Sequence, residues 1–137
     1  TEIYTLSLHD ALPICCAKAL AQVALYYPEE PFPELGLQGL KKSLNDPNPV
    51  VHIASAMALG EIGDAALEIL VETLQTTDNV ALAVSIANAL ASVGGDQAVE
   101  VLTKLSEDDS VDGYVKETAI SALSRMAMVK QYSRPEN

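Results

Sequence analysis

A chain of 137 residues is long enough for one domain with a continuous core, and 49% hydrophobic residues are typical of a folded protein. Aromatic residues make up only 4%, with no Trp and one Phe, which favours closely packed helices over β-sheet. The formal net charge of −11 disfavours nucleic-acid and membrane partners, because an acidic surface repels phosphates and anionic lipid headgroups.

Residues 1–14 read TEIYTLSLHDALPI and match, over the whole stretch, the conceptual translation of a common short-read sequencing adapter. We therefore expect a non-native segment, to be set aside from fold reasoning as a tag would be. His9 and Asp10 are discounted as functional residues for the same reason. We expect the natural chain to begin near Cys15 and to be the C-terminal part of a longer protein.

The next segment has the apolar spacing of a helix, with Cys16, Leu20 and Val23 on one face. Cys15 and Cys16 could form a reactive pair, but a nucleophile needs a base and an electropositive setting, for which this acidic chain gives no clear evidence. We interpret both as small packing side chains. Two adjacent cysteines give no disulfide framework, which fits a reducing compartment.

Residues 27–33 read YPEEPFP and, with the acidic side chains Glu29, Glu30 and Glu34, are interpreted as an exposed, stiff acidic loop. Its length makes it the most individual feature of the chain, because long loops often have a function.

A short sequence element recurs along the rest of the chain. Residues 59–63 read LGEIG, residues 90–94 read LASVG after a spacing of 31, and residues 123–126 read LSRM after a further 33. An earlier copy begins at Leu20, so the chain contains about three and a half copies. The differences in spacing fall in predicted loops, as insertions in repeat proteins do.

Apolar residues within each copy are spaced i, i+3, i+4, i+7, which predicts two helices per copy. The first helices have this pattern at Leu67, Leu70, Val71 and Leu74 and at Ala98, Val101, Leu102 and Leu105. The second helices have it at Val51, Ala54, Ser55 and Ala58 and at Ala83, Ile86, Ala87 and Leu90. A helix with one apolar stripe buries that stripe only against a neighbour, so we predict an all-α fold, an armadillo-like α-solenoid.

Helix boundaries are indicated by Gly63 and by Gly94 with Gly95, where helices are expected to end. Asp64 and Asp96 follow these glycines and are predicted to be N-caps. The predicted repeat domain spans residues 15–130, and residues 131–137 are predicted to form a polar tail.

The run of residues 44–64, LNDPNPVVHIASAMALGEIGD, resembles the HEAT-like repeat of phycobilisome lyases and many bacterial scaffold proteins, D-x-x-x-x-V-R-x-x-A-x-x-A-L-G-x-I-G. The resemblance extends from about Leu37 to Met126 and implies an α-solenoid. In that family an Arg after the Val ties neighbouring repeats to a loop Asp. Here His52, Ala83 and Lys116 replace it, so Asp46, Asp78 and Asp108 are interpreted as caps or turn residues.

A weaker resemblance links residues 112–126 to the helical C-terminal extension of some bacterial sulfatases. The sulfatase nucleophile signature is absent at residues 15–18, so any hydrolase centre would lie upstream.

Few side chains suggest chemistry of their own. His52 is the only histidine outside residues 1–14 and is interpreted as a lone helix-surface histidine, because a metal site or general base needs further partners. Glu107, Asp108, Asp109 and Asp112 do not match a calcium-loop spacing and are interpreted as a solvated turn. We identify no catalytic, cofactor-binding or metal-ligating residue, and we predict that the protein is not an enzyme.

Aligning the second helices predicts which of their faces point inward. Val51, Leu82 and Val115 form one inward row, and Ala58, Ala89 and Ala122 form another. The predicted interaction face, on the concave side of the solenoid, consists of Met57, Glu61, Asn88, Ser92, Ser121 and Arg125. This face either binds a partner protein or is merely solvated, or is covered by the missing part of the same chain.

The leading interpretation is therefore a non-catalytic protein-binding or scaffold module without a cofactor. The alternative is an accessory helical domain of an enzyme, either a sulfatase-like hydrolase or a bilin lyase-like protein. Fold analogy alone does not choose between them. The compartment follows the same choice, with the cytoplasm as default and export expected for a sulfatase-like parent.

Overall fold

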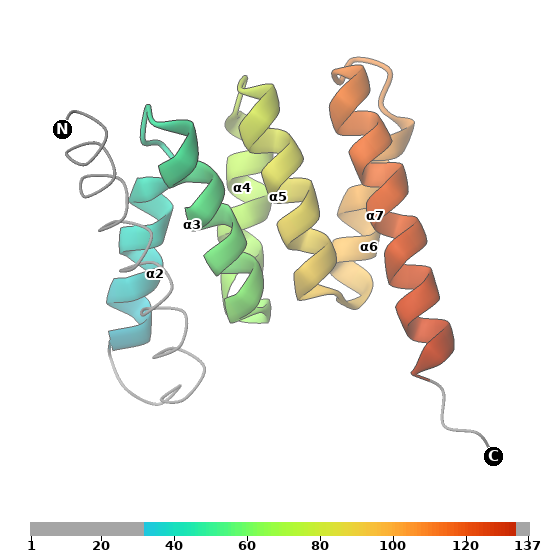
Figure 1. Ribbon diagram of the computed structural model, residues 1–137, viewed down its shortest axis with the longest axis horizontal. Coiled ribbons are helices and arrows are strands. Elements are labelled where there is room, and N and C mark those ends of the chain that lie inside the picture. Colours follow the sequence, from blue (N-terminus) through green and yellow to red (C-terminus); the bar gives the residue numbers. More distant parts are fainter. Residues whose placement is uncertain (1–31, 134–137) are drawn as a thin grey trace, which may run out of the picture.

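The computed structural model describes residues 32–133, which form α-helices and no strand (Figure 1). The predictions for residues 1–14, for Cys15 and Cys16, and for the repeat copy at Leu20 lie outside the described residues. The helices are α2 (Phe32–Ser43), α3 (Pro49–Ile62), α4 (Leu67–Thr76), α5 (Val80–Val93), α6 (Gly95–Glu107) and α7 (Gly113–Tyr132). A short 3-10 helix, η1 (Asp64–Ala66), precedes α4.

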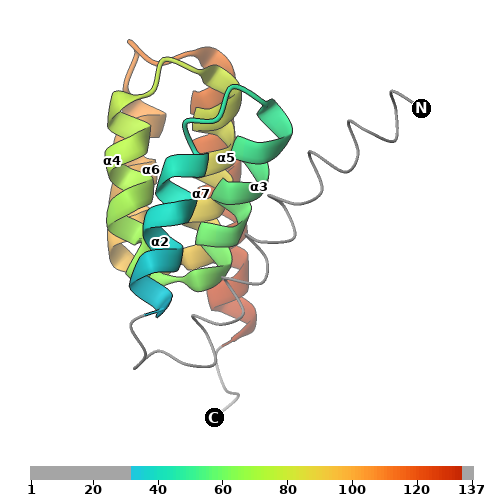
Figure 2. The same ribbon diagram turned by 90° about the vertical axis from the view of Figure 1, so that its left-hand side faces the viewer.

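The helices stack in successive pairs, α2 with α3, α4 with α5, and α6 with α7 (Figures 1 and 2). The second helices α3, α5 and α7 form one layer, in which α5 packs against both α3 and α7. The first helices α4 and α6 lie behind this layer. This arrangement confirms the predicted all-α solenoid, in which each pair contacts only its neighbours.

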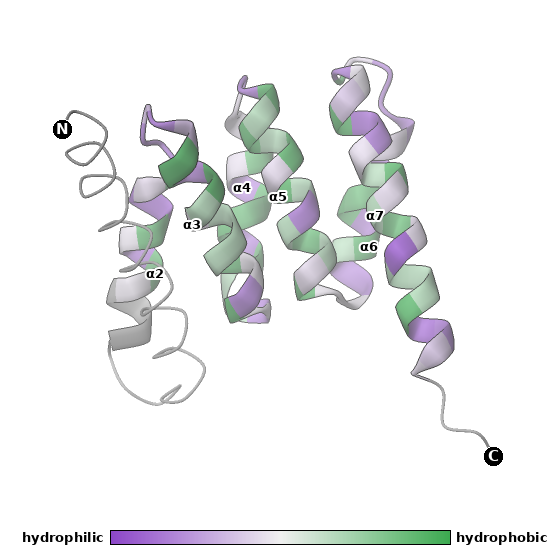
Figure 3. Cartoon of the chain, in the orientation of Figure 1, coloured by the Kyte–Doolittle hydropathy of each residue, from purple (hydrophilic) through white to green (hydrophobic). Residues whose placement is uncertain are grey.

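The buried side chains are those that the repeat alignment placed inward. Leu59, Ile86 and Leu90 of the second helices are fully buried, and so are Leu70 and Leu102 of the first helices. Both predicted inward rows are also buried, namely Val51, Leu82 and Val115 and Ala58, Ala89 and Ala122. In Figure 3, α3 and α5 are coloured mainly hydrophobic, whereas α7 alternates with polar segments. The core thus runs continuously along the stack.

Small residues set the distance between α3 and α5. A Cβ atom placed on Gly60 would lie 3.1 Å from Cα, Cβ and the carbonyl oxygen of Ala89. The two backbones therefore approach closely at this point, as glycine and alanine permit.

The prediction that Asp64 and Asp96 are N-caps is wrong. Gly63 (φ 91°) and Gly94 (φ 74°) occupy the cap positions, and neither aspartate side chain makes a capping hydrogen bond. The loops that follow α3 and α5 are so short that a single glycine both ends one helix and precedes the next. The carboxylates instead lie in the first turn of each helix, where the positive end of the helix dipole stabilises their negative charge.

Side-chain caps are found at the second helices. Asn48, Asn79 and Asp112 precede α3, α5 and α7 and accept hydrogen bonds from the backbone N–H of Val50, Leu82 and Tyr114, respectively.

Two helix boundaries differ from the predicted ones. Helix α2 begins at Phe32 and includes Glu34, so this part of the predicted acidic loop is helical, while residues 27–31 lie outside the described residues. Pro33 is tolerated because the first turn of a helix leaves backbone N–H groups without helical partners. Helix α7 continues to Tyr132, past Met126, where the predicted closing helix ended. None of the helices described is long and apolar enough to cross a membrane.

Candidate interaction surface

The six residues of the predicted interaction face lie on α3, α5 and α7. Glu61, Ser92, Ser121 and Arg125 are exposed, and Asn88 is half-buried. Met57 is 60% exposed, a large fraction for an apolar side chain. Asn88, Ser121 and Arg125 border one shallow hollow of about 390 Å³, whereas Met57 and Glu61 do not line it.

One hydrogen bond joins two residues of this face across neighbouring helices. Nη2 of Arg125 on α7 donates to Oδ1 of Asn88 on α5 at 2.5 Å. Nδ2 of Asn88 in turn donates to the carbonyl oxygen of Val84 at 3.1 Å. Asn88 is therefore oriented from both sides, and Arg125 is held along the seam between α5 and α7.

Three residues of the hollow were not among the predicted face residues. Tyr114, which is 75% exposed, and Glu117 line it together with Thr118. Tyr114 and Thr118 lie seven and three positions before Ser121, which is the spacing of one helix face. Extending the outward row of α7 toward its N-terminus would have found them.

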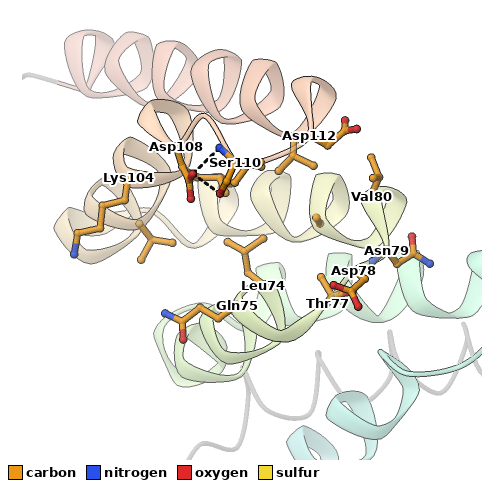
Figure 4. Close-up of a pocket in the computed structure, with 15 residues that line it drawn as sticks. Leu74, Gln75, Thr77, Asp78, Asn79, Val80, Lys104, Asp108, Ser110 and Asp112 are labelled. Atoms are coloured by element: carbon orange, nitrogen blue, oxygen red, sulfur yellow. Dashed lines mark hydrogen bonds between the residues drawn. The ribbon is translucent and has the colours of Figure 1, made fainter.

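A second hollow lies at the edge of the stack, where the α4–α5 and α6–α7 loops face each other (Figure 4). It has a volume of about 630 Å³ and an apolar floor that includes Leu74, Val101 and Leu105. Asp78, Asp108 and Asp112 lie on its rim with Lys104, and Nζ of Lys104 pairs with Glu100 at 2.7 Å.

Asp108 is fixed by its own loop. Its Oδ1 accepts hydrogen bonds from the hydroxyl and the backbone N–H of Ser110, at 2.6 and 2.9 Å. The hydroxyl bond, followed by the backbone bond, holds the pKa of Asp108 below its ordinary value. This rim is therefore negative under neutral conditions.

The loop aspartates behave as turn residues. Asp46 accepts from the backbone N–H of Asn48 at 2.8 Å, Asp108 bonds Ser110, and Asp112 caps α7. Lys116, which replaces the family Arg, pairs with Asp109 of its own loop at 2.6 Å. Within residues 32–133, no three His, Cys, Asp or Glu side chains converge as metal ligands would.

The interpretation of His52 as a surface residue is wrong. His52 is only 3% exposed, and its Nε2 is buried without a hydrogen-bond partner. The equivalent residue in the next repeat, Ala83, is also buried. This position of the second helix therefore faces the interior, and the alanine in the neighbouring copy was the signal that could have indicated it.

Comparison with known proteins agrees with this geometry. Residues 37–124 match the family described as HEAT repeats. The chain belongs to the HEAT-repeat family. The predicted resemblance to HEAT-like proteins of the phycobilisome-lyase type is also confirmed, because two relatives have names from bilin and phycocyanin biology.

The first relative of this HEAT-repeat chain is the uncharacterized phycocyanin operon protein Z of Pseudanabaena tenuis, 55% identical over 118 residues. That alignment covers 86% of this chain but 58% of the relative, so the chain spans less than two thirds of that protein. The second is the bilin biosynthesis protein CpeZ of a Synechococcus species, 30% identical over 130 residues, which cover 90% of this chain and 69% of the relative.

The second relative overturns the prediction that the protein is not an enzyme. A relative that is 30% identical over 90% of this HEAT-repeat chain is named a bilin biosynthesis protein. The prediction is therefore wrong. It rested on the absence of a contiguous catalytic motif, but functional residues of a solenoid are brought together from separate repeats, so their pattern is not contiguous in sequence.

Proposed function

We propose that this protein takes part in bilin biosynthesis as a lyase-type HEAT-repeat protein that acts on a bilin-carrying protein. The observation behind this proposal is the similarity to the bilin biosynthesis protein CpeZ, which includes the described repeats. The 55% identity to a phycocyanin operon protein supports a phycobiliprotein subunit as the acceptor. Both relatives favour the bilin lyase-like alternative, and neither supports the sulfatase-like one.

In this proposal the predicted interaction face binds the acceptor protein. The face presents Met57 beside small and neutral polar side chains, such as Ser92 and Ser121, in a layer supported by the buried alanine row. Only Glu61 and Arg125 among the six residues of the face carry a charge, so most of the face is desolvated without loss of charge hydration. The net charge of −11 favours an acceptor that presents neutral or basic groups to it.

The first experiment tests the activity. The chain is co-expressed with a phycocyanin subunit and bilin-producing enzymes, and covalently attached bilin is measured by zinc-enhanced fluorescence after denaturing electrophoresis. We expect the amount of bilin-labelled subunit to rise several-fold over cells without the chain. An unchanged amount, with the chain soluble and helical, would contradict the proposal.

The second experiment tests the face. Met57→Glu combined with Ser121→Tyr places a charge and a bulky ring on it, and neither position takes part in the Arg125–Asn88 hydrogen bond. We expect capture of the phycocyanin subunit to weaken about tenfold, as burial of an unpaired charge at an interface does. Gln75→Glu, which adds a charge at an exposed position of α4 outside this face, is the matched control and should leave capture unchanged. Equal capture by both variants would remove this face from the proposal.

A further inference from the structure

A third hollow lies beside the C-terminal half of α7, which extends past the turn between α5 and α6 (Figure 1). Its volume is about 720 Å³, within the range of about 300–1,000 Å³ that is usual for small-molecule sites. We call it the α7 groove. Its walls are mainly apolar and include Val93, Leu123, Met126 and Val129, and two cationic side chains, Arg125 and Lys130, line it as well.

These two cations differ from most others in the described part of the chain. Lys41, Lys104 and Lys116 each pair with a carboxylate, at 2.8, 2.7 and 2.6 Å. Arg125 bonds the neutral amide of Asn88, and neither it nor Lys130 forms an ion pair with another described residue. Asp96 is the one carboxylate that lines the groove, so the lining has a formal charge of +1 within a chain of −11.

An apolar wall with two cations outside any described ion pair is complementary to a molecule with a flat apolar body and carboxylates along one edge. An open-chain tetrapyrrole has this chemistry, because its conjugated rings bear two propionate groups. A guanidinium can both stack on such rings and bind a carboxylate with two parallel hydrogen bonds. We infer that the α7 groove binds the bilin through its propionates, an inference that rests on the proposed function.

The position of Arg125 connects this groove with the interaction face. Arg125 lines both the α7 groove and the hollow formed with Asn88 and Ser121. A bilin in the groove would therefore lie beside an acceptor protein on the face. The hydrogen bond to Asn88 restrains the guanidinium at this border between the groove and the face.

Binding is tested with the 137-residue chain and biliverdin, a free open-chain tetrapyrrole, by absorbance titration. We expect saturable one-to-one binding. The variant Arg125→Gln with Lys130→Glu should bind about tenfold or more weakly, because hydrogen bonds to charged groups are lost. Lys42→Glu, which changes an exposed cation on α2 outside the groove, is the matched control and should bind as the unaltered chain does.

The dimethyl ester of biliverdin tests the role of the carboxylates. On the unaltered chain, we expect the ester to bind about tenfold more weakly than the acid. On the double variant, we expect the ester to bind as weakly as it does on the unaltered chain. Equal binding of acid and ester, or equal binding by the double variant and the Lys42→Glu control, would overturn the inference.

Two further outcomes separate this inference from its alternatives. If the groove is instead covered by a second copy of the chain, sedimentation will show a dimer that Val129→Asp dissociates, and the inference is overturned. If biliverdin does not bind but the phycocyanin subunit is still captured through Met57 and Ser121, the inference fails while the proposed function stands. If the unaltered chain binds biliverdin but does not capture the phycocyanin subunit, only the docking of the acceptor is contradicted.

Discussion

His52 lies in the interior of the stack although its imidazole is polar. Its Nε2 is buried without a hydrogen-bond partner in the described structure, a state that costs about 1–3 kcal/mol of desolvation. The same position is Ala83 in the next repeat and Lys116 in the last, where the chain solves the packing differently. Equivalent backbone positions in different repeats therefore carry side chains with different desolvation costs.

Replacing His52 tests this energetic cost. His52→Leu removes the unpaired nitrogen and retains most of the volume, so we expect the free energy of unfolding to rise by about 1 kcal/mol. His52→Ala also removes the nitrogen but leaves a cavity, and we expect a loss of about 2 kcal/mol. Urea unfolding followed by circular dichroism at 222 nm measures both. A leucine variant less stable than the unaltered chain would show that Nε2 has a partner in solution.

Asp108 is the residue whose titration the loop most clearly controls. In Ser110→Ala the hydroxyl hydrogen bond is lost, so we expect the pKa of Asp108 to rise toward its ordinary value. Because the folded-state pKa is lowered, the stabilisation is present above the unfolded-state pKa and is lost as pH falls through the folded-state pKa. Carboxyl-detected NMR titration measures the change. Glu100, whose pKa is lowered by Lys104, is the internal control and should not shift.

At the scale of elements, the most extensive packing is between α3 and α5. Gly60 is buried against Ala89, whereas the equivalent position in α5 is Ala91 and in α7 is Ser124, which is exposed. The same helical position is therefore tightly packed in one repeat and solvent-facing in another. What distinguishes the two is whether another described helix lies against that face.

This difference predicts that a larger side chain destabilises the protein at Gly60 but not at the equivalent Ser124. Gly60→Leu forces α3 and α5 apart, so we expect a loss of about 1–3 kcal/mol of unfolding free energy, as overpacked cores show. Ser124→Leu at the exposed position should change stability by less than about 0.5 kcal/mol. Thermal and urea unfolding of both variants provide the comparison. Equal losses would indicate that α7 is also covered at Ser124.

At the scale of the whole molecule, stability is distributed along one dimension. Helix α5 packs against α3, α4, α6 and α7, whereas α2 packs mainly against α3. In a solenoid each repeat is stabilised by its interfaces with its neighbours, so the central helix should open least often.

Amide hydrogen exchange monitored by mass spectrometry tests this gradient. We expect the slowest exchange in α5, faster exchange in α2, and the fastest in the part of α7 that extends past residue 126. Uniform protection along the chain would mean that the repeats open as a single unit.

The sequence by itself determined the repeat, its helix pairs and the two buried rows, because apolar spacing at 3.6 residues per turn specifies which face of a helix leaves water. It also indicated where Met57, Asn88 and Ser121 lie, since these follow from the same register. The interior position of His52 was decided by tertiary structure, because it depends on the neighbouring helices. The α7 groove and its two cations likewise exist only where α7 passes the α5–α6 turn, since a pocket is formed by residues that the chain brings together from separate helices.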